Sequence, residues 1–414
     1  MTDRSTRFGE WMYGFGVSKM RFGLESTAEL LRRLGDPQND ITAIHVAGSD
    51  GKGSTCSMIY SVLLKAGVNA GLYTSPHLMR FNERISVNGK DIEDDELGSL
   101  MEKVRPVADR MASEGMECTF FEVATALAFL HFSDKGVKYA VIETGMGGRL
   151  DATNVLMPEV TAITHISMEH AEILGDTVEK IAFEKAGIIK HKVPVITSNT
   201  NSVLDVIRDV AKKRDAPLIA IPPDEVKVLS FSDGRVETEY QGRKYRIGIP
   251  GSCQAENAAV AIECIRALNI GITGDQISNG LKDVVWRGRM EYLKDEEIII
   301  DVSHTAAGAE ILADDILKTY GKVILIIGMF GDKSADEICK HMSRTASRIV
   351  VTSPNSERAM PAERLAEIMR RYSNDVSVEN GIGEAIDSVI GKGTILITGS
   401  LNMAGEAMSW LKKI

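Results

Sequence analysis

A glycine-rich loop between an apolar strand and an amphipathic helix restricts the folds open to this chain. Residues 41–47 form an apolar run typical of a buried strand, residues 53–66 have the pattern of a helix, and residues 48–55 read GSDGKGST. Glycines allow backbone N–H groups to face a phosphate, and a helix N-terminus adds partial positive charge. Lys52 can reach terminal phosphate oxygens, and a hydroxyl of the Ser-Thr pair can face a magnesium ion. Only two residues separate the first two glycines, a departure from the usual Walker spacing, yet the context favours a phosphate-binding loop over a plain glycine turn.

Strand-like and helix-like segments alternate along the rest of the chain, which is the pattern of a parallel sheet covered by helices. Further buried strands are expected at residues 139–143, 160–166, 193–198 and 217–221, and helices at 95–111, 121–132, 177–186, 203–213, 254–268 and 274–284. Short alternating runs over residues 225–250 predict a small antiparallel hairpin set. Near the N-terminus, Ser26 and Glu29 have the spacing of a capping box for an earlier helix.

A second strand–helix series follows, with strands expected at 297–302, 323–329, 348–353 and 394–398 and a last helix at 403–411. The polar run at residues 294–297 is the expected joint between the two series. The sequence therefore predicts an α/β fold with a P-loop-type, mostly parallel sheet ATPase domain over residues 1–293. A smaller Rossmann-like α/β C-terminal domain is expected over residues 294–414, in keeping with ~150 residues per domain.

Composition narrows the possible partners and compartment. Lys and Arg number 48 and Asp and Glu 58, a formal net charge of -10, so nucleic acid is not expected as a partner. The five cysteines are widely spread and form no CxxC pair, which argues against a disulfide framework or a zinc ribbon. The first residues lack the apolar core of a secretory signal, and no apolar run approaches the ~20 residues of a membrane-spanning helix. We expect a soluble, cytoplasmic protein that binds no membrane.

Three further segments carry residues suited to chemistry, each with a simpler alternative. Glu143 ends a predicted strand and opens a glycine-rich loop, where a carboxylate suits a magnesium ion, although a surface glutamate beside a turn is equally possible. His170 follows another strand, and a lone histidine there is more often a hydrogen-bonded structural residue than a ligand. Lys185 lies in a helical segment, where a lysine is usually solvated. If it is drawn into a cleft beside cations, desolvation lowers its pKa and makes the amine reactive.

These segments, in this order, resemble the folylpolyglutamate synthase and dihydrofolate synthase family, a branch of the Mur ligase superfamily. The resemblance covers nearly the whole chain. Besides the glycine-rich loop, it is carried by Phe22–Glu25, Leu34–Gln38, Tyr73–Leu78, Arg80–Ile85, Thr119–Glu122, Glu143–Asn154, Glu169-His170, Leu174–Thr177, Phe183–Lys185, Gln254 with Asn257, Trp286 with Gly288-Arg289, Gly331–Lys333 and Thr398–Ser400. Any one motif could arise by chance, but the set together is highly specific.

The resemblance implies a role for each matching position. ATP phosphates would be held by Gly51, Lys52, Gly53 and Ser54, and the nucleotide would be contacted by Asn257, Arg289 and Asp301. Magnesium would be ligated by Ser75, Glu143 and His170, beside Lys185, which matches a lysine that the family carries as a carbamate; a monovalent cation is also possible. The pterin-side pocket would comprise Thr119, Phe120, Phe121, Glu122, Leu150, Asp151 and Ala152, and the incoming glutamate would meet His304 and Ser400. The catalytic residues would be Lys185, Lys52 and His170.

The implied activity is an ATP-dependent, ADP-forming ligase that joins L-glutamate to a folate-type acid through an acyl phosphate, acting as a monomer. The sequence departs from the family pattern at three places. Asp50 stands where the family usually has Asn, residues 301–306 read DVSHTA in place of DGAHNP, and Ser26 stands where many dihydrofolate-synthesising members carry Arg. These departures leave open whether the acceptor is dihydropteroate, a reduced folate or another acid, and whether glutamate is the amino acid. An ATP-binding relative without ligase turnover is a further alternative.

Overall fold

The computed structural model describes residues 11–12, 14, 23–232, 235–331 and 334–412. Phe22, Asp332 and Lys333, which belong to motifs of the family resemblance, lie outside these residues. The chain forms two compact units, one made of Met1–Val226 with Glu256–Val284 and the other of Lys227–Ala255 with Val285–Ile414. This division places the hairpin segment and residues 285–293 in the second unit, whereas the domains proposed from the sequence meet at residues 293 and 294.

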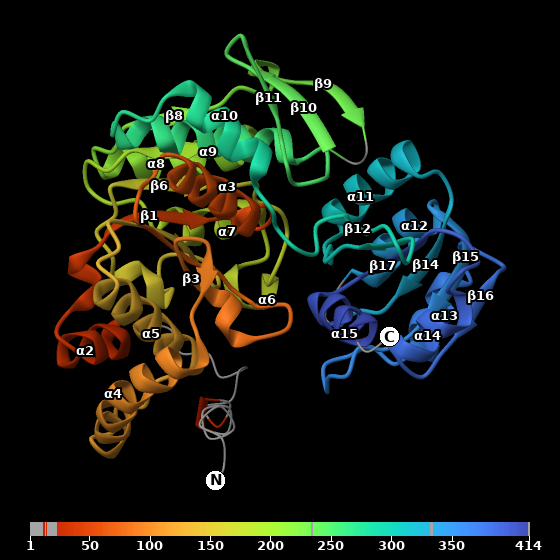
Figure 1. Ribbon diagram of the computed structural model, residues 1–414, viewed down its shortest axis with the longest axis horizontal. Coiled ribbons are helices and arrows are strands. Elements are labelled where there is room, and N and C mark those ends of the chain that lie inside the picture. The colour runs from red at the N-terminus through yellow and green to blue at the C-terminus, as the bar shows by residue number, and fades with distance from the viewer. Residues whose placement is uncertain (1–10, 13, 15–22, 233–234, 332–333, 413–414) are drawn as a thin grey trace. The chain divides into compact units, whose positions relative to one another are not determined.

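An eight-stranded sheet forms the centre of the first unit (Figure 1). Its order is β4-β3-β2-β5-β1-β6-β7-β8, and the six strands from β2 to β8 in this order are parallel. The strands are β1 (Thr42–Ala47), β2 (Ala70–Tyr73), β3 (Ile85–Val87), β4 (Lys90–Asp91), β5 (Tyr139–Glu143), β6 (Val160–Ile163), β7 (Val195–Thr197) and β8 (Leu218–Ala220). The central strands β5, β1 and β6 are almost entirely buried because helices cover both faces of the sheet. The carboxyl ends of β1, β5 and β6 are adjacent, which brings the loops after them together.

Helices pack on this sheet in separate core clusters. Ala43 of β1 packs in one cluster with α2, α4 and α5. Ala47 lies four positions further along, on the same side of the strand, and packs in a second cluster with α7 and α8. Helices α3 and α10 pack against each other. The helices are α2 (Glu25–Arg33), α3 (Lys52–Lys65), α4 (Asp94–Ser113), α5 (Phe120–Asp134), α6 (Ala171–Leu174), α7 (Val178–Ala186), α8 (Asn201–Lys213), α9 (Gln254–Leu268) and α10 (Gly274–Asp283), with short 3₁₀ turns at Pro37–Asp40, Phe81–Arg84, Ala152–Val155 and Pro223–Glu225.

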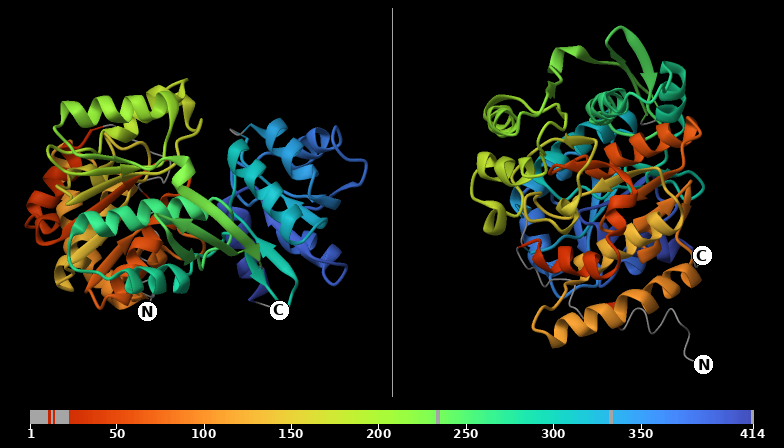
Figure 2. Two further views of the ribbon diagram at one scale, coloured as in Figure 1. Left: turned by 90° about the horizontal axis from the view of Figure 1, so that it is seen from above. Right: turned by 90° about the vertical axis from the view of Figure 1, so that its left-hand side faces the viewer.

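The second unit contains two sheets, and Figure 2 shows helices on both sides of the larger one. Its order is β12-β13-β17-β14-β15-β16, with only β12 antiparallel among these described strands. Its strands are β12 (Glu291–Leu293), β13 (Ile298–Ile300), β14 (Val323–Ile327), β15 (Ala346–Val351), β16 (Val376–Val378) and β17 (Ile395–Thr398), and its helices are α11 (Ala306–Thr319), α12 (Ala335–Ser343), α13 (Ala362–Met369), α14 (Ile382–Val389) and α15 (Leu401–Leu411). The doubly covered sheet confirms the predicted α/β class.

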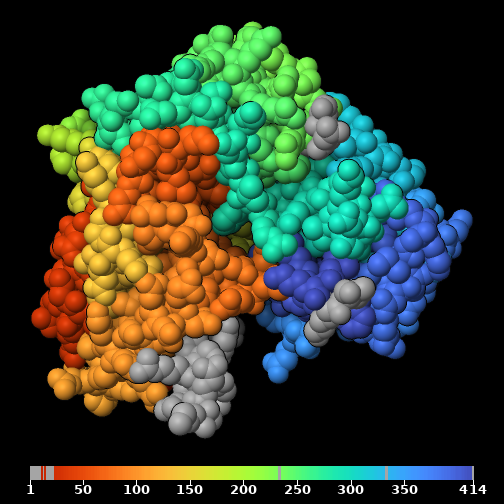
Figure 3. Space-filling view, in the orientation of Figure 1, coloured from red at the N-terminus to blue at the C-terminus, as the bar shows by residue number. Residues whose placement is uncertain are grey.

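The smaller sheet of the second unit confirms the predicted hairpin set. It consists of β9 (Val226–Ser232), β10 (Arg235–Tyr240) and β11 (Arg243–Arg246) in the order β11-β10-β9. It reaches the surface on the face drawn in Figure 3, and Val228 and Leu229 of β9 are exposed. No helix in the described part of the chain combines the length and the apolar character needed to cross a bilayer.

The predicted capping box at Ser26 and Glu29 is wrong. Helix α2 begins at Glu25 with Leu24 at the N-cap position, so Ser26 already lies inside the first turn and is buried. The Glu29 carboxylate instead pairs with Arg32 and Arg33 at 2.8 and 2.6 Å. The helix starts two residues too early for Ser26 to occupy its N-cap position.

Candidate active site

The glycine-rich loop connects β1 to α3 and is fixed against the segment that follows β6. The backbone N–H groups of Ser49 and Asp50 donate to the carbonyl oxygen of His165 at 2.9 and 3.1 Å. The hydroxyl of Thr164 donates to the carbonyl oxygen of Asp50 at 2.7 Å. A Cβ atom on Gly48 would lie 1.8 Å from Thr164 Oγ1, so only glycine fits at the start of the loop.

Lys52 is the first residue of α3 and lies folded over the loop. Its Nζ donates to the carbonyl oxygens of Gly48 and Ser49 at 2.8 and 3.0 Å. The hydroxyl of Thr55, one turn into the helix, is buried and has no hydrogen-bond partner in the described structure. A loop of backbone amides, a lysine and an unsatisfied hydroxyl at a helix N-terminus fits a bound phosphate chain.

Lys185 of α7 reaches the same loop from the other side. Its side chain is 2% exposed, and its Nζ donates to the Gly48 carbonyl oxygen at 2.7 Å and to Glu169 Oε1 at 2.6 Å. Burial and the nearby Lys52 ammonium lower the pKa of Lys185 to about 8, although Glu169 opposes this shift. The lysine is therefore not solvated. It lies where a reactive amine would face the phosphate loop.

Glu169 is a functional neighbour to which the sequence assigned no role. Burial disfavours its charged form, but Lys52 and Lys185 outweigh that effect and lower its pKa to about 2. The carboxylate is therefore ionised between two lysines. The sequence feature that could have indicated a role for Glu169 is its position directly before the predicted site residue His170.

Glu143 and Ser75 meet at the carboxyl ends of adjacent strands β5 and β2. Glu143 is buried, and its Oε2 accepts a hydrogen bond from the Ser75 backbone N–H at 3.1 Å. His170 follows Glu169 directly and is the N-cap residue of α6, with a left-handed backbone (φ 46°). Within the described residues, no group of three or more His, Cys, Asp or Glu side chains is gathered as a metal cluster. The predicted magnesium ligands, one hydroxyl, one carboxylate and one imidazole, do not depend on such a cluster, and hard oxygen donors suit Mg²⁺, which keeps several waters.

The loop after Glu143 is packed onto the end of α7. The backbone N–H of Arg149 donates to the Glu184 carbonyl oxygen at 2.7 Å, and the Arg149 guanidinium pairs with the Glu184 carboxylate at 2.9 Å. A Cβ on Gly148 would lie 2.7 Å from the carbonyl oxygen of Lys185. The loop that carries Glu143 and the helix that carries Lys185 therefore hold each other in place.

The residues predicted for the pterin-side pocket take different places. Thr119 and Glu122 form a capping box that starts α5, and Glu122 also accepts from the Thr27 hydroxyl at 3.2 Å. Phe120 is buried in the core beneath them. Phe121 is only partly buried and stacks on Tyr73, with ring centroids 6.1 Å apart.

The loop that follows Glu143, residues 144–149, is termed the glycine loop. It ends at Leu150, Asp151 and Ala152. The Asp151 carboxylate accepts from the backbone N–H groups of Gly145 and Met146 at 2.9 Å each. Leu150 is partly buried, and Ala152 begins a short 3₁₀ turn. A Cβ on Gly145 would lie 2.5 Å from the Phe121 ring, so the backbone of the glycine loop rests directly on that ring.

In the second unit, Asp301 organises the turn that carries Arg289. Its two carboxylate oxygens accept from the backbone N–H groups of Met290 at 3.0 Å and Ser303 at 2.7 Å. The Nε of Arg289 is buried and has no hydrogen-bond partner among the described residues. An unsatisfied donor of this kind suits an anionic or polar ligand.

His304 and Ser400 follow neighbouring strands β13 and β17 of the second unit. The His304 ring Nδ1 lies 2.9 Å from the Val302 carbonyl oxygen, and the Ser400 hydroxyl caps α15 by accepting from Met403 N. The altered 301–306 segment keeps its helix start, because Thr305 caps α11 by accepting from Gly308 N at 3.0 Å. Asn257 lies in the first unit, on α9, where it contacts the glycine-rich loop at Gly51.

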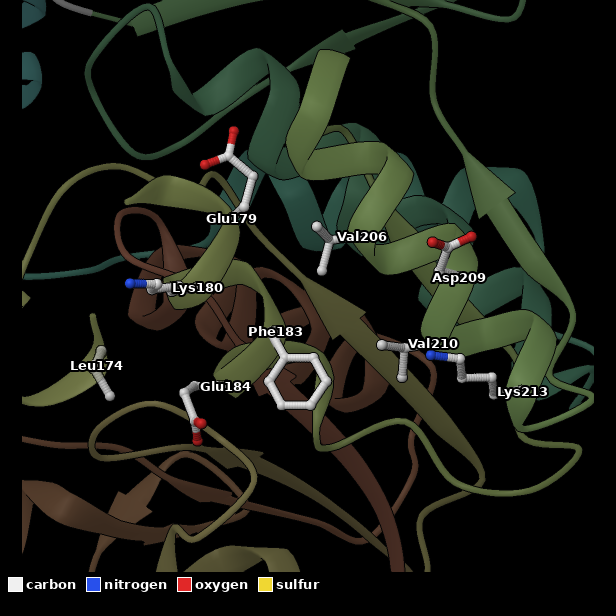
Figure 4. Close-up of a pocket in the computed structure, with 9 residues that line it drawn as sticks. All are labelled: Leu174, Glu179, Lys180, Phe183, Glu184, Val206, Asp209, Val210 and Lys213. Atoms are coloured by element: carbon white, nitrogen blue, oxygen red, sulfur yellow. The ribbon is translucent and has the colours of Figure 1, made fainter. Parts of the chain in front are cut away.

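A separate surface pocket of about 450 Å³ lies on the outer face of α7, between α7 and α8 (Figure 4). Its apolar floor includes Phe183, Val206 and Val210, and charged side chains surround it. None of the predicted site residues lines this pocket. Helix α7 thus presents Phe183 outward and the buried Lys185 toward the phosphate loop.

Replacing Gly51 with alanine tests the closeness of this loop to α9. Gly51 has φ 85°, and an added Cβ would lie 2.3 Å from Asn257 Oδ1. Gly67 has a similar φ of 75° but open space around it, so Gly67→Ala is a matched control. Both substitutions are expected to cost about 1 kcal/mol of unfolding free energy for the left-handed backbone. Gly51→Ala should cost about 1–3 kcal/mol more because Asn257 must move. Equal losses in denaturant unfolding would show that Asn257 is not held against the loop.

Comparison with known protein families and structures identifies the class of enzyme to which the chain belongs. The Mur ligase middle domain family matches residues 46–265, and the Mur ligase, glutamate ligase domain family matches residues 288–401. The folylpolyglutamate synthase of Mycobacterium tuberculosis, in a structure complexed with ADP, superposes with a TM-score of 0.90 at 29% identity over 98% of both chains. The fold and the phosphate loop are therefore those of a Mur ligase.

Two curated relatives specify the branch. The dihydrofolate synthase/folylpolyglutamate synthase of Bacillus subtilis is 35% identical over 97% of this chain and 98% of its own length. The probable bifunctional folylpolyglutamate synthase/dihydropteroate synthase of Haloferax volcanii is 33% identical over 95% of this chain, which spans only 49% of that protein. The chain belongs to the folylpolyglutamate synthase/dihydrofolate synthase family of ATP-dependent ligases, as its sequence motifs predict.

Proposed function

We propose that this chain joins L-glutamate to a folate-type carboxylic acid at the expense of ATP, acting as a monomer. The observation that carries the proposal is the buried Lys185, whose Nζ lies 2.7 Å from the carbonyl oxygen of Gly48 in the phosphate loop. A protein that only bound nucleotide would have no need to bury a second lysine and a carboxylate beside that loop, because burying charged groups is costly.

The first chemical step transfers a phosphoryl group to the acid. A carboxylate oxygen of the acceptor attacks the γ-phosphorus of ATP in line, the bond to the β-phosphate oxygen breaks, and ADP leaves. Lys52, Ser54 and the amides of Gly51 and Gly53 hold the phosphates and offset their charge. Asn257, Arg289 and Asp301 hold the rest of the nucleotide.

The second step forms the amide. The α-amino nitrogen of glutamate attacks the acyl carbon, the carbon–oxygen bond to phosphate breaks, and the amine loses a proton as inorganic phosphate leaves. His304 and Ser400 orient the glutamate, while Phe121 and residues 150–152 hold the acid. Most of the rate enhancement then comes from positioning and charge neutralisation, without a covalent enzyme intermediate.

Ser75, Glu143 and His170 are the residues that would hold magnesium, and the ion would supply charge neutralisation on the phosphates. We also propose that Lys185 carries a carbamate. Its lowered pKa supports this, because carbamate formation requires the neutral amine, and the added carboxylate would help to position the magnesium ion. The domain assignment of 1–293 for ATP and acid binding and 294–414 for glutamate belongs to the same proposal.

The test is phosphate release with ATP, magnesium and L-glutamate against a panel of pterin acids, with the products weighed by mass spectrometry. The expected result is one added glutamyl unit on dihydropteroate or on a reduced folate, which also names the acceptor. Nucleotide binding without product on any folate-type acid would refute the proposal. Product formed only with another amino acid would show that the altered 301–306 segment changes the amino-acid specificity.

A further inference from the structure

His45 lies in the middle of β1, inside the sheet, and makes a polar contact that the proposed reaction does not use. It is fully buried, and its ring Nε2 lies 2.8 Å from Thr153 Oγ1. The Thr153 hydroxyl in turn contacts Asp151 Oδ1. A hydrogen-bonded chain therefore connects the core of the sheet with the end of the glycine loop.

The donor of each hydrogen bond between His45, Thr153 and Asp151 can be assigned from the number of hydrogens available. Three backbone N–H groups, of Gly145, Met146 and Thr153, donate to Asp151, which is therefore an acceptor. With Asp151 as the carboxylate, the single hydroxyl hydrogen of Thr153 points to Asp151 Oδ1, and His45 Nε2 donates to Thr153 Oγ1. Its other ring nitrogen, Nδ1, is buried without a hydrogen-bond partner in the described structure, and burial lowers the pKa of His45 to about 3. A neutral ring with one fixed tautomer follows.

The Asp151 end of this series of hydrogen bonds fixes the glycine loop beside Phe121. Asp151 Oδ2 accepts from Gly145 N and Met146 N at 2.9 Å each. A Cβ on Gly145 would lie 2.5 Å from the Phe121 ring, so the loop backbone rests directly on that ring. A shift of Asp151 would therefore move the backbone of this loop relative to the Phe121 ring.

We infer that His45 and Thr153 are positioning residues that hold Asp151 and the glycine loop in the geometry that binds the acid acceptor. This inference rests on the proposed function for the identity of that acceptor. The two residues act through Asp151 and touch neither the phosphate loop nor Lys52 among the described hydrogen bonds. They should therefore affect binding of the acid and leave binding of ATP unchanged.

Thr153→Val tests the inference because valine has nearly the same shape and lacks the hydroxyl. The KM for the acid is expected to rise about tenfold, with the KM for ATP unchanged. Thr153→Ser restores the hydroxyl and should restore the KM for the acid. Thr345→Val is the matched control, since it removes another fully buried hydroxyl, which donates to the Met342 carbonyl oxygen at 2.8 Å in the second unit.

Amide hydrogen exchange gives a second readout that does not depend on turnover. In Thr153→Val the N–H groups of Gly145 and Met146 should exchange faster than in wild type, and in Thr345→Val they should not. An unchanged KM for the acid, or equal rises in both KM values, would overturn the inference. If the wild type ligates no folate-type acid, the proposed function fails, and exchange alone then decides: unchanged protection of the two amides in Thr153→Val refutes the positioning role.

Discussion

Lys185→Ala is expected to lower kcat about 10³-fold while the Kd for ATP changes less than about threefold. Lys185 donates to Gly48 O and Glu169 in this structure; it shares the Gly48 carbonyl oxygen with Lys52, but no backbone N–H of the loop is bonded to its side chain. Nucleotide affinity should therefore survive its loss. Turnover should fall, because the side chain that would help to position the magnesium ion is gone. Phosphate release and equilibrium binding of ATP measure the two quantities separately.

Two further variants keep this prediction interpretable. Removing Lys185 leaves Glu169 buried without one of its cations, which destabilises the fold. Lys185→Gln retains a hydrogen-bond donor for Glu169 but no amine that can take up carbon dioxide, and it should lose turnover to the same extent. Lys180→Ala changes an exposed lysine of the same helix, paired with Asp176 at 2.6 Å, and should leave turnover near the wild-type value. Full activity in either Lys185 variant would remove that side chain from the reaction.

The longer helices and strands could be predicted because the spacing of their hydrophobic residues follows from which of their side chains are buried. Helices α4, α5 and α8 and strands β1 and β5 lie where the hydrophobic pattern indicated, within one or two residues at each end. Strands β3 and β4 were not predicted, because they have three and two residues, too few to show an alternation. Both form the antiparallel edge of the sheet, where tertiary pairing rather than local pattern decides the structure.

Helix capping shows why a correct motif alone is insufficient. Thr119 and Glu122 have the same spacing as Ser26 and Glu29, yet only the first pair forms a capping box. Thr119 has an extended backbone just before α5, so its side chain can accept from the N–H of Glu122. Ser26 lies inside α2 on its buried face. The difference depends on which residue starts the helix, and this is determined by packing that the local sequence does not encode.

Within the site, the sequence located the loops but not the contacts between them. Adjacent parallel strands bring the residues after β1, β5 and β6 to one edge of the sheet, as strand order alone implies once it is known. The burial of Lys185 could not be predicted, since a lysine on a short amphipathic helix is usually solvated. Its pairing with Glu169 joins positions 16 residues apart and depends on how α7 packs. The role of Thr153 was equally hidden, because its partner His45 precedes it by 108 residues.

Lys52→Ala should differ from Lys185→Ala in its effect on ATP affinity. The KM for ATP is expected to rise about 10²-fold, together with a fall in kcat of about 10²-fold or more, because the lysine would contact the phosphates both before and during transfer. In this structure its Nζ donates to Gly48 O and Ser49 O, so the ammonium is already held at the loop and needs little movement to meet a phosphate.

Lys65→Ala is the matched control for Lys52. Lys65 is the last residue of α3, at the end of the helix opposite Lys52, and it pairs with the exposed Asp283. It should leave both kinetic constants near their wild-type values. Measured side by side, the two active-site lysines separate binding from chemistry: loss of ATP affinity in Lys52→Ala with retained affinity in Lys185→Ala assigns phosphate binding to the loop and the chemical step to α7. Equal loss of affinity in both variants would mean that the buried lysine pair acts as one phosphate-binding unit, and the carbamate role proposed for Lys185 would then be wrong.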